Sequence, residues 1–153
     1  MELNLEKFNI RRSDAKIKGS YALPENKERY IVKAQGLIGV DIFSGDRIEI
    51  INTEGGQICE VVAFDTLGKN NHSIIKEKIN GNADFIKYIL AKSNDKKLLL
   101  EKLQKKKIDF NKTKSSNFFN HTTLANEKLI LTIQEDGFVI FAAPGYDMQV
   151  DQQ

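Results

Sequence analysis

One cysteine and two histidines are the residues of this chain best suited to metal binding or nucleophilic chemistry. Cys59 is the single cysteine, and His72 and His121 are the two histidines. Cys59, Glu60 and His121 could converge on one ion, because thiolate, carboxylate and imidazole groups are the usual ligands of zinc. They lack the short paired spacing of zinc motifs, and a cysteine with apolar neighbours is typically a core residue. We expect no metal site and no catalytic residue, with the Cys59, Glu60 and His121 site as the alternative.

Two polar residues, Gln57 and Glu60, are the best candidates for contact with a small ligand or another domain. They follow the glycine pair Gly55-Gly56. No Gly-Lys-Ser/Thr sequence follows that pair, so the sequence predicts no phosphate loop. Hydrogen-bonded polar residues of a strand would give the same pattern without a ligand. Both interpretations of Gln57 and Glu60 therefore stay open.

The elements that must position these residues are β-strands. Residues 47–51 alternate polar and apolar side chains, Glu54-Gly55-Gly56 reverses the chain, and residues 57–64 form a second, more apolar strand. This pattern predicts antiparallel β-structure. Further strands are predicted at residues 30–34, 128–134 and 138–142, and the Asp136-Gly137 pair predicts a hairpin between the last two. Residues 1–28 lack a clean period, so the first predicted strand is 30–34.

After residue 71 the apolar period changes from two to about 3.6, which indicates helices. Residues 74–79 predict one or two helical turns. Residues 85–90 predict a second helix, with Asn82 or Asp84 as its cap, and residues 94–106 predict a third.

The predicted fold class is α+β. It is a mostly antiparallel β barrel or sandwich with a helical insertion of about three short helices in residues 72–107. The 153 residues suffice for one hydrophobic core. We therefore expect a single domain over residues 1–153, with β portions at about 29–65 and 117–145.

Charge and composition argue against several classes of function. The chain has 23 basic and 21 acidic residues and a net charge of +2, which predicts neither a nucleic-acid partner nor a membrane partner. No apolar run approaches the roughly 18 residues of a membrane span, and the charged start lacks the apolar core of a signal peptide. With a single cysteine, these features predict a soluble cytoplasmic protein.

A basic segment runs from Lys87 to Lys114. It contains ten lysines against three acidic residues. A solvated helix face would explain it, and a module that binds a polyanion is the weaker alternative.

Two segments of this chain resemble the urea-carboxylase-associated domain family. Residues 44–65, SGDRIEIINTEGGQICEVVAFD, are similar to the segment in which a glycine turn precedes Gly-Asn-Gln-Ala-x-Asp. The matching positions are Gly55, Gly56, Gln57, Ile58, Cys59 and Glu60, and Glu60 stands where the family has aspartate. Residues 136–148, DGFVIFAAPGYDM, resemble the closing segment of a variant fused in front of a folate-binding aminomethyltransferase module, similar to the glycine-cleavage T protein. The resemblance covers roughly residues 30–151, including a basic helical insert between the β portions.

The resemblance implies that this chain is the N-terminal part of a longer protein. Its partner would be a downstream aminomethyltransferase module of the same chain, with tetrahydrofolate as the cofactor of that module and none in this domain. The full protein would transfer a one-carbon unit from an N-methyl or aminomethyl donor to tetrahydrofolate. The present chain would be an accessory, non-catalytic domain that binds a ligand or packs against the module.

The chain also departs from the family. Free-standing members, as the resemblance implies, carry Gly-Arg-His-Asp and cysteine-containing motifs in their second half. Here the sequence reads Ala142-Ala143-Pro144, and no histidine follows His121. Chemistry that depends on those groups is therefore expected to be absent. The alternative function is a free-standing small β-barrel, metal-dependent hydrolase of the same family, with Cys59, Glu60 and His121 at its metal.

Overall fold

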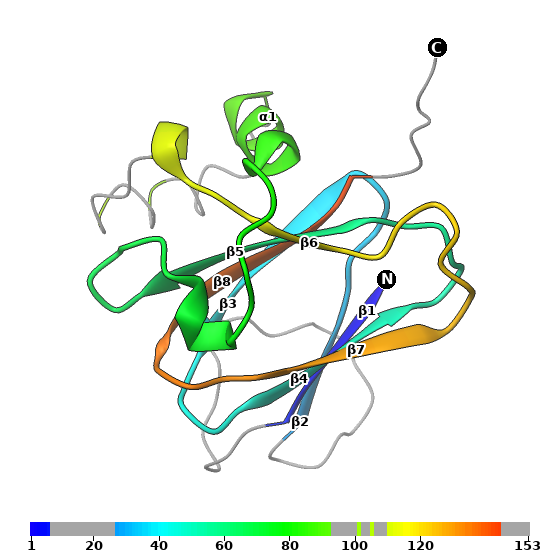
Figure 1. Ribbon diagram of the computed structural model, residues 1–153, viewed down its shortest axis with the longest axis horizontal. Coiled ribbons are helices and arrows are strands. Elements are labelled where there is room, and N and C mark those ends of the chain that lie inside the picture. Colours follow the sequence, from blue (N-terminus) through cyan, green and yellow to red (C-terminus); the bar gives the residue numbers. More distant parts are fainter. Residues whose placement is uncertain (7–26, 93–100, 102–104, 106–109, 145–153) are drawn as a thin grey trace.

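The computed structural model describes residues 1–6, 27–92, 101, 105 and 110–144 (Figure 1). The strands in this part of the chain are β1 (Glu2–Glu6), β2 (Lys27–Ile31), β3 (Gly36–Ile42), β4 (Arg47–Asn52), β5 (Cys59–Asp65), β6 (Ser116–Phe118), β7 (Glu127–Thr132) and β8 (Gly137–Ala143). The helical elements are the 3₁₀ turns η1 (His72–Ile75) and η3 (Phe110–Lys112) and the α-helix α1 (Asp84–Lys92).

The strands form two four-stranded sheets. Sheet A has the order β2-β1-β4-β7, and sheet B has the order β3-β8-β5-β6. All neighbouring strands are antiparallel. Within the described residues neither sheet closes on itself. The architecture is therefore an open two-sheet sandwich, and the barrel form of the prediction is not supported.

The glycine turns of the sequence connect strands of different sheets. β4 and β7 lie in sheet A, whereas β5 and β8 lie in sheet B. The prediction of a hairpin at Asp136-Gly137 is therefore wrong, and the Gly55-Gly56 turn makes no hairpin either. The reason lies in burial. β5 and β8 are buried on both faces, whereas β4 buries alternate residues. A strand that is apolar on both faces belongs in the sheet that is covered on both faces.

The main core lies between the two sheets. It takes apolar side chains from seven of the strands together with Ile74 and Ile75 of η1. The largest of the fully buried core side chains include Tyr30 of β2 and Phe141 of β8. Alternation along each strand directs these residues inward.

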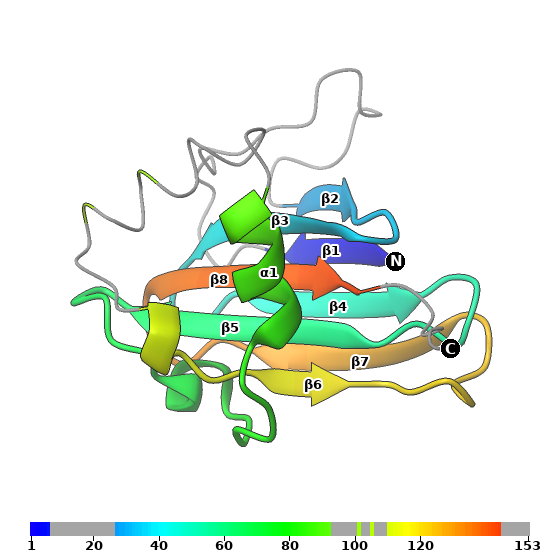
Figure 2. The same cartoon turned by 90° about the horizontal axis from the view of Figure 1, so that it is seen from above.

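A second core lies on the outer face of sheet B, beneath α1. Val62 and Phe64 of β5 and Ile140 of β8 pack there against Ile86 and Leu90 of the helix. Figure 2 shows α1 lying across β8 and β5. Ile86 and Leu90 are four residues apart and so share one helix face.

β1 was missed by sequence reasoning. Leu3 and Leu5 are buried between the sheets, and Glu2, Asn4 and Glu6 alternate with them. β1 pairs with β2 on one side and with β4 on the other. Two leucines in five residues are too short a pattern to indicate a strand by themselves.

The prediction of a three-helix insertion is not supported. Residues 74–79 were expected to be helical, but the structure has the single 3₁₀ turn η1, which ends at Lys76 with φ 57°. Ile79 is 48% exposed and packs on no helix face. The second predicted helix corresponds to α1, and the third, residues 94–106, falls almost wholly outside the described residues. Among the described helices, none has the length and apolarity needed to cross a membrane.

Candidate functional site

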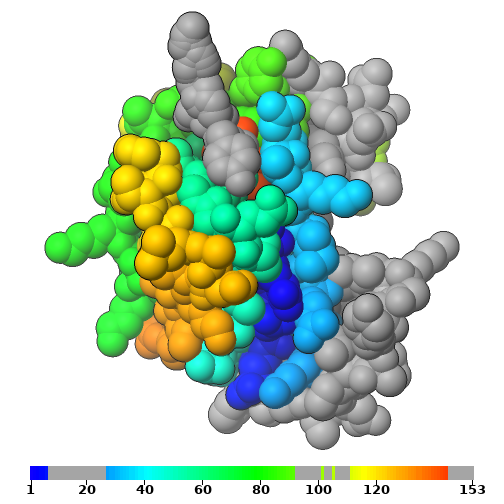
Figure 3. Space-filling view, turned by 90° about the vertical axis from the view of Figure 1, so that its right-hand side faces the viewer, coloured from blue at the N-terminus to red at the C-terminus, as the bar shows by residue number. Residues whose placement is uncertain are grey.

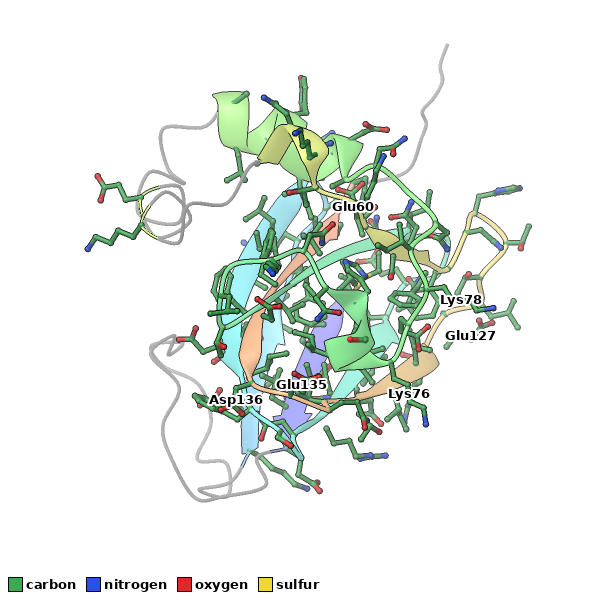
Figure 4. All side chains as sticks on the ribbon, turned by 60° about the vertical axis from the view of Figure 1, so that its left-hand side comes forward. Glu60, Lys76, Lys78, Glu127, Glu135 and Asp136 are labelled. Atoms are coloured by element: carbon green, nitrogen blue, oxygen red, sulfur yellow. The ribbon has the colours of Figure 1, made fainter. Side chains whose placement is uncertain are left out.

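Glu60 of β5 holds the first turn of α1. Its Oε1 accepts a hydrogen bond from the Ile86 N–H at 2.8 Å, and its Oε2 accepts one from the Phe85 N–H at 3.4 Å. Figure 4 shows Glu60 just below α1, whereas Glu135 and Asp136, in the turn before β8, lie at the other end of the view. The first N–H groups of a helix have no partner within the helix. Glu60 supplies that partner from a neighbouring strand, so it acts as the cap of α1.

The carboxyl group of Glu60 is also buried, with the residue 6% exposed. Burial raises the pKa of Glu60, and the hydrogen bonds from Ile86 and Phe85 oppose this rise. Asp84 raises the pKa further, and Lys87 lowers it. The carboxylate is thus stabilised mainly by the helix it caps, which leaves it little capacity to bind a ligand from solvent.

Gln57 and the two preceding glycines form a corner between the sheets. Gly55 and Gly56 have φ values of +81° and +68°. A Cβ on Gly55 would lie 2.8 Å from both Ala125 N and Thr123 O. The Gln57 side chain is nearly buried and donates to Ile58 O at 2.8 Å. The segment that carries the family resemblance therefore has a clear structural role in packing the corner against residues 123–126.

The three residues of the alternative metal site are not brought together. Cys59 and Glu60 are adjacent on β5 and point to opposite faces. Cys59 packs in the core between the sheets, where burial raises the pKa of its thiol. His121 is exposed, in the turn after β6. Among the described residues, no group of three His, Cys, Asp or Glu side chains could hold a metal ion.

His72, which the sequence analysis assigned to no site, is a buried polar residue. Its Nε2 accepts a hydrogen bond from the Ala63 N–H at 3.2 Å, and its Nδ1 lies 2.6 Å from Ser116 Oγ. Ser116 Oγ donates in turn to Lys78 O at 2.6 Å. These partners require a neutral imidazole with its proton on Nδ1. Burial lowers the pKa of His72 to about 4.

The His72 and Ser116 pair has the composition of a nucleophile with its base but not the geometry. In such a pair the serine hydroxyl donates to the imidazole. Here Ser116 donates to a carbonyl and is fully buried. The pair instead extends the hydrogen bonding along the edge of β5. The strand β6 pairs with Cys59–Val61 only, and beyond it the His72 imidazole accepts the hydrogen bond of the Ala63 N–H. No sequence pattern marks this role, since the partner of His72 is a backbone amide.

Two lysines of the basic segment, Lys87 and Lys114, contact neutral oxygen atoms. Lys87 Nζ donates to Asn111 O at 3.3 Å, and Lys114 Nζ donates to Asn82 Oδ1 at 2.7 Å. Lys112 lies exposed in η3. Asn82, one of the two predicted caps of α1, is thus engaged by a lysine, while Glu60 caps the helix.

The sequence is similar to a trimethylamine-oxide aldolase of Ruegeria pomeroyi. The two are 35% identical over 135 residues, which is 87% of this chain and 17% of the aldolase. The chain thus spans about a sixth of the length of that relative, as a small domain of a larger protein would. No protein-family model matches the sequence. No solved structure matches it either.

Proposed function

We propose that this chain is an accessory β-domain of a larger folate-dependent, aminomethyltransferase-like enzyme whose catalytic residues lie outside it. The similarity to the trimethylamine-oxide aldolase carries this proposal. The match covers 87% of this chain but 17% of the length of the aldolase. A segment of that size within a long enzyme is a domain, and a domain can serve by packing or by binding a ligand.

The positions of the reactive side chains support a non-catalytic role. Glu60 caps α1, His72 completes the edge of β5, and Cys59 lies in the core. Each of these groups already has its hydrogen-bonding or packing partner within the fold. A catalytic group must instead reach the substrate.

The larger enzyme would act on a methylated amine or an amine oxide, and the name of the relative gives trimethylamine oxide for that protein. Tetrahydrofolate would be held by the downstream module and would accept the one-carbon unit. The role of this domain would be to pack against that module.

A direct test uses the 153-residue chain with trimethylamine N-oxide or trimethylamine, each with and without tetrahydrofolate. Proton NMR of the substrate methyl groups is expected to show no loss of trimethylamine N-oxide or of trimethylamine. Turnover above a protein-free control would overturn the accessory role.

A domain exchange tests the role in a larger enzyme. The matched 135 residues of the aldolase are deleted in one variant and replaced by this chain in a second. Deletion is expected to lower activity or soluble yield, and the replacement to restore it. A folded chimera that stays as impaired as the deletion variant would contradict the proposal.

Elemental analysis separates the proposal from a metal-dependent hydrolase. The purified chain is expected to carry no stoichiometric zinc, manganese or iron. One equivalent of metal that is lost in Cys59→Ser and His121→Ala would favour the enzyme instead.

A further inference from the structure

The outer face of sheet A carries charged side chains in cross-strand pairs. β7, β4, β1 and β2 lie side by side on this face (Figure 3). Its ion pairs are Arg29 with Glu2 at 3.1 Å, Lys27 with Glu6 at 3.7 Å and Lys128 with Glu49 at 3.9 Å. Opposite charges on neighbouring strands stabilise such a pair of strands. Most charges of this face are therefore balanced within it.

One row of the face has more positive than negative charge. Glu6 on β1 lies directly opposite Lys27 on β2 and directly opposite Arg47 on β4. Glu6 pairs with Lys27. No described carboxylate lies within 4 Å of the exposed Arg47 guanidinium. Among the described residues, this row therefore holds two cations and one carboxylate, and that carboxylate pairs with Lys27.

A hollow of about 230 Å³ lies at this row, between β2, β1 and β4. Asn4 is one of its lining residues, and it accepts from Arg29 Nε at 3.3 Å and donates to Glu49 Oε1 at 3.4 Å. Arg29 and Glu49 are therefore both hydrogen-bonded to the Asn4 amide. Each also has an ion-pair partner, which is Glu2 for Arg29 and Lys128 for Glu49. Among the lining cations, Arg47 has no ion-pair partner in the part of the chain that the structure describes.

We propose that this hollow binds a small monocarboxylate, with Arg47 as its main partner. The planar guanidinium fits a carboxylate with two parallel hydrogen bonds. Lys27, whose side chain is 50% exposed, adds a second positive charge at the same row. Glu6, Glu28 and Glu49 also line the hollow and repel ligands with three negative charges. The site would therefore take acetate-like ligands in preference to sulfate or phosphate.

NMR titration of the whole chain tests this site. Acetate is added at constant ionic strength, with chloride as the balancing ion, and the Arg47 side-chain N–H and the β1 and β4 amides are followed. Saturable shifts with a millimolar dissociation constant are expected. Arg47→Gln is expected to weaken binding by about tenfold or more. Lys112→Gln removes an exposed cation of η3 that does not line the hollow and should leave the affinity unchanged.

Sulfate and Arg47→Lys complete the test. Sulfate at the same ionic strength is expected to bind more weakly than acetate, and Arg47→Lys, which keeps the charge but loses the planar fork, should fall between the wild type and Arg47→Gln. Unfolding midpoints confirm that each variant is folded. Absence of saturable shifts, or equal weakening by Arg47→Gln and Lys112→Gln, would overturn the proposal. Either result leaves the proposed accessory role as it stands.

Discussion

The outer faces of the two sheets differ in whether a helix covers them. Sheet B is covered by α1, so β5 and β8 are buried along nearly their whole length. On sheet A the described residues leave Ile31 and Ile130 exposed at 57% and 44%, and its charges pair across the strands. The covered face thus needs buried polar groups with fixed partners, whereas the charged groups of the open face remain partly exposed to solvent.

The buried titratable groups follow from this difference. Glu60 and His72 both serve β5, one by capping the helix that covers it and one by completing its edge. A buried polar group without a partner is costly, so each must be held precisely. Disrupting the covered side should therefore cost far more stability than equivalent changes on the open face.

The largest expected effect comes from matched isoleucine truncations. Ile86→Ala removes a fully buried side chain of α1 and should lower the free energy of unfolding by about 2–5 kcal/mol. Ile130→Ala removes the same atoms from the open face and should change it by less than about 0.5 kcal/mol. Urea denaturation measures both. Equal losses would show that a partner or segment covers the open face as well.

The pH dependence of stability should report on the buried imidazole. The pKa of His72 is about 4 in the fold and near 6.5 when unfolded, so the unfolded state binds more protons between these values. The stabilisation is complete above pH 6.5 and is lost as the pH falls towards 4, by about 3 kcal/mol in total. Glu60, with its raised pKa, has the opposite sign and offsets part of this loss.

Two variants separate His72 from other groups. Urea midpoints between pH 7 and pH 4.5 should fall steeply for the wild type and for His121→Gln, whose imidazole is exposed. His72→Gln should be less stable at pH 7 and should show a flatter pH profile. A His72→Gln profile as steep as that of the wild type would show that another group controls the acid sensitivity.

The corner between the sheets should tolerate no side chain at Gly55. Gly55→Ala combines a positive φ with contacts of 2.8 Å to backbone atoms of the 123–125 loop. It should lower the free energy of unfolding by about 2 kcal/mol or more. Gly68→Ala, at a similar φ of 82°, measures the strain alone. Thermal unfolding of both variants gives the comparison. A loss no larger at Gly55 than at Gly68 would argue against the packed corner.

The strands could be predicted where their apolar pattern is long. The segments at β4, β5, β7 and β8 were predicted within a few residues, because each carries several apolar residues in sequence. Their assignment to sheets could not be predicted from the turns, since Asp136-Gly137 fits a chain reversal within one sheet or between two. Burial on both faces of β5 and β8 decides it, and that depends on α1, far away in the sequence.

The candidate residues show the same limit. Gln57 and Glu60 were singled out as candidates for contact with a ligand or another domain, which stays a prediction. The hydrogen-bond partners of Glu60 are backbone amides 25 and 26 residues away. These partners, and the amide that binds His72, are backbone N–H groups, so no sequence pattern indicates them. Likewise, the excess of positive charge around Glu6 depends on the register of β1 between β2 and β4, and β1 itself was not predicted.

The smallest expected effect tests the cap of α1. Glu60→Gln keeps an acceptor oxygen for the Ile86 N–H but places an NH₂ group against the Phe85 N–H, which should lower the free energy of unfolding by about 1 kcal/mol. The pKa of Glu60 is raised in the fold, so its stabilising contribution declines as the pH rises through the folded pKa. The deficit of Glu60→Gln should therefore shrink with increasing pH. Hydrogen exchange of the Ile86 amide should quicken in Glu60→Gln and stay unchanged in Glu49→Gln, a carboxylate on the open face. Unaltered exchange in both variants would show that α1 is held by its apolar contacts alone.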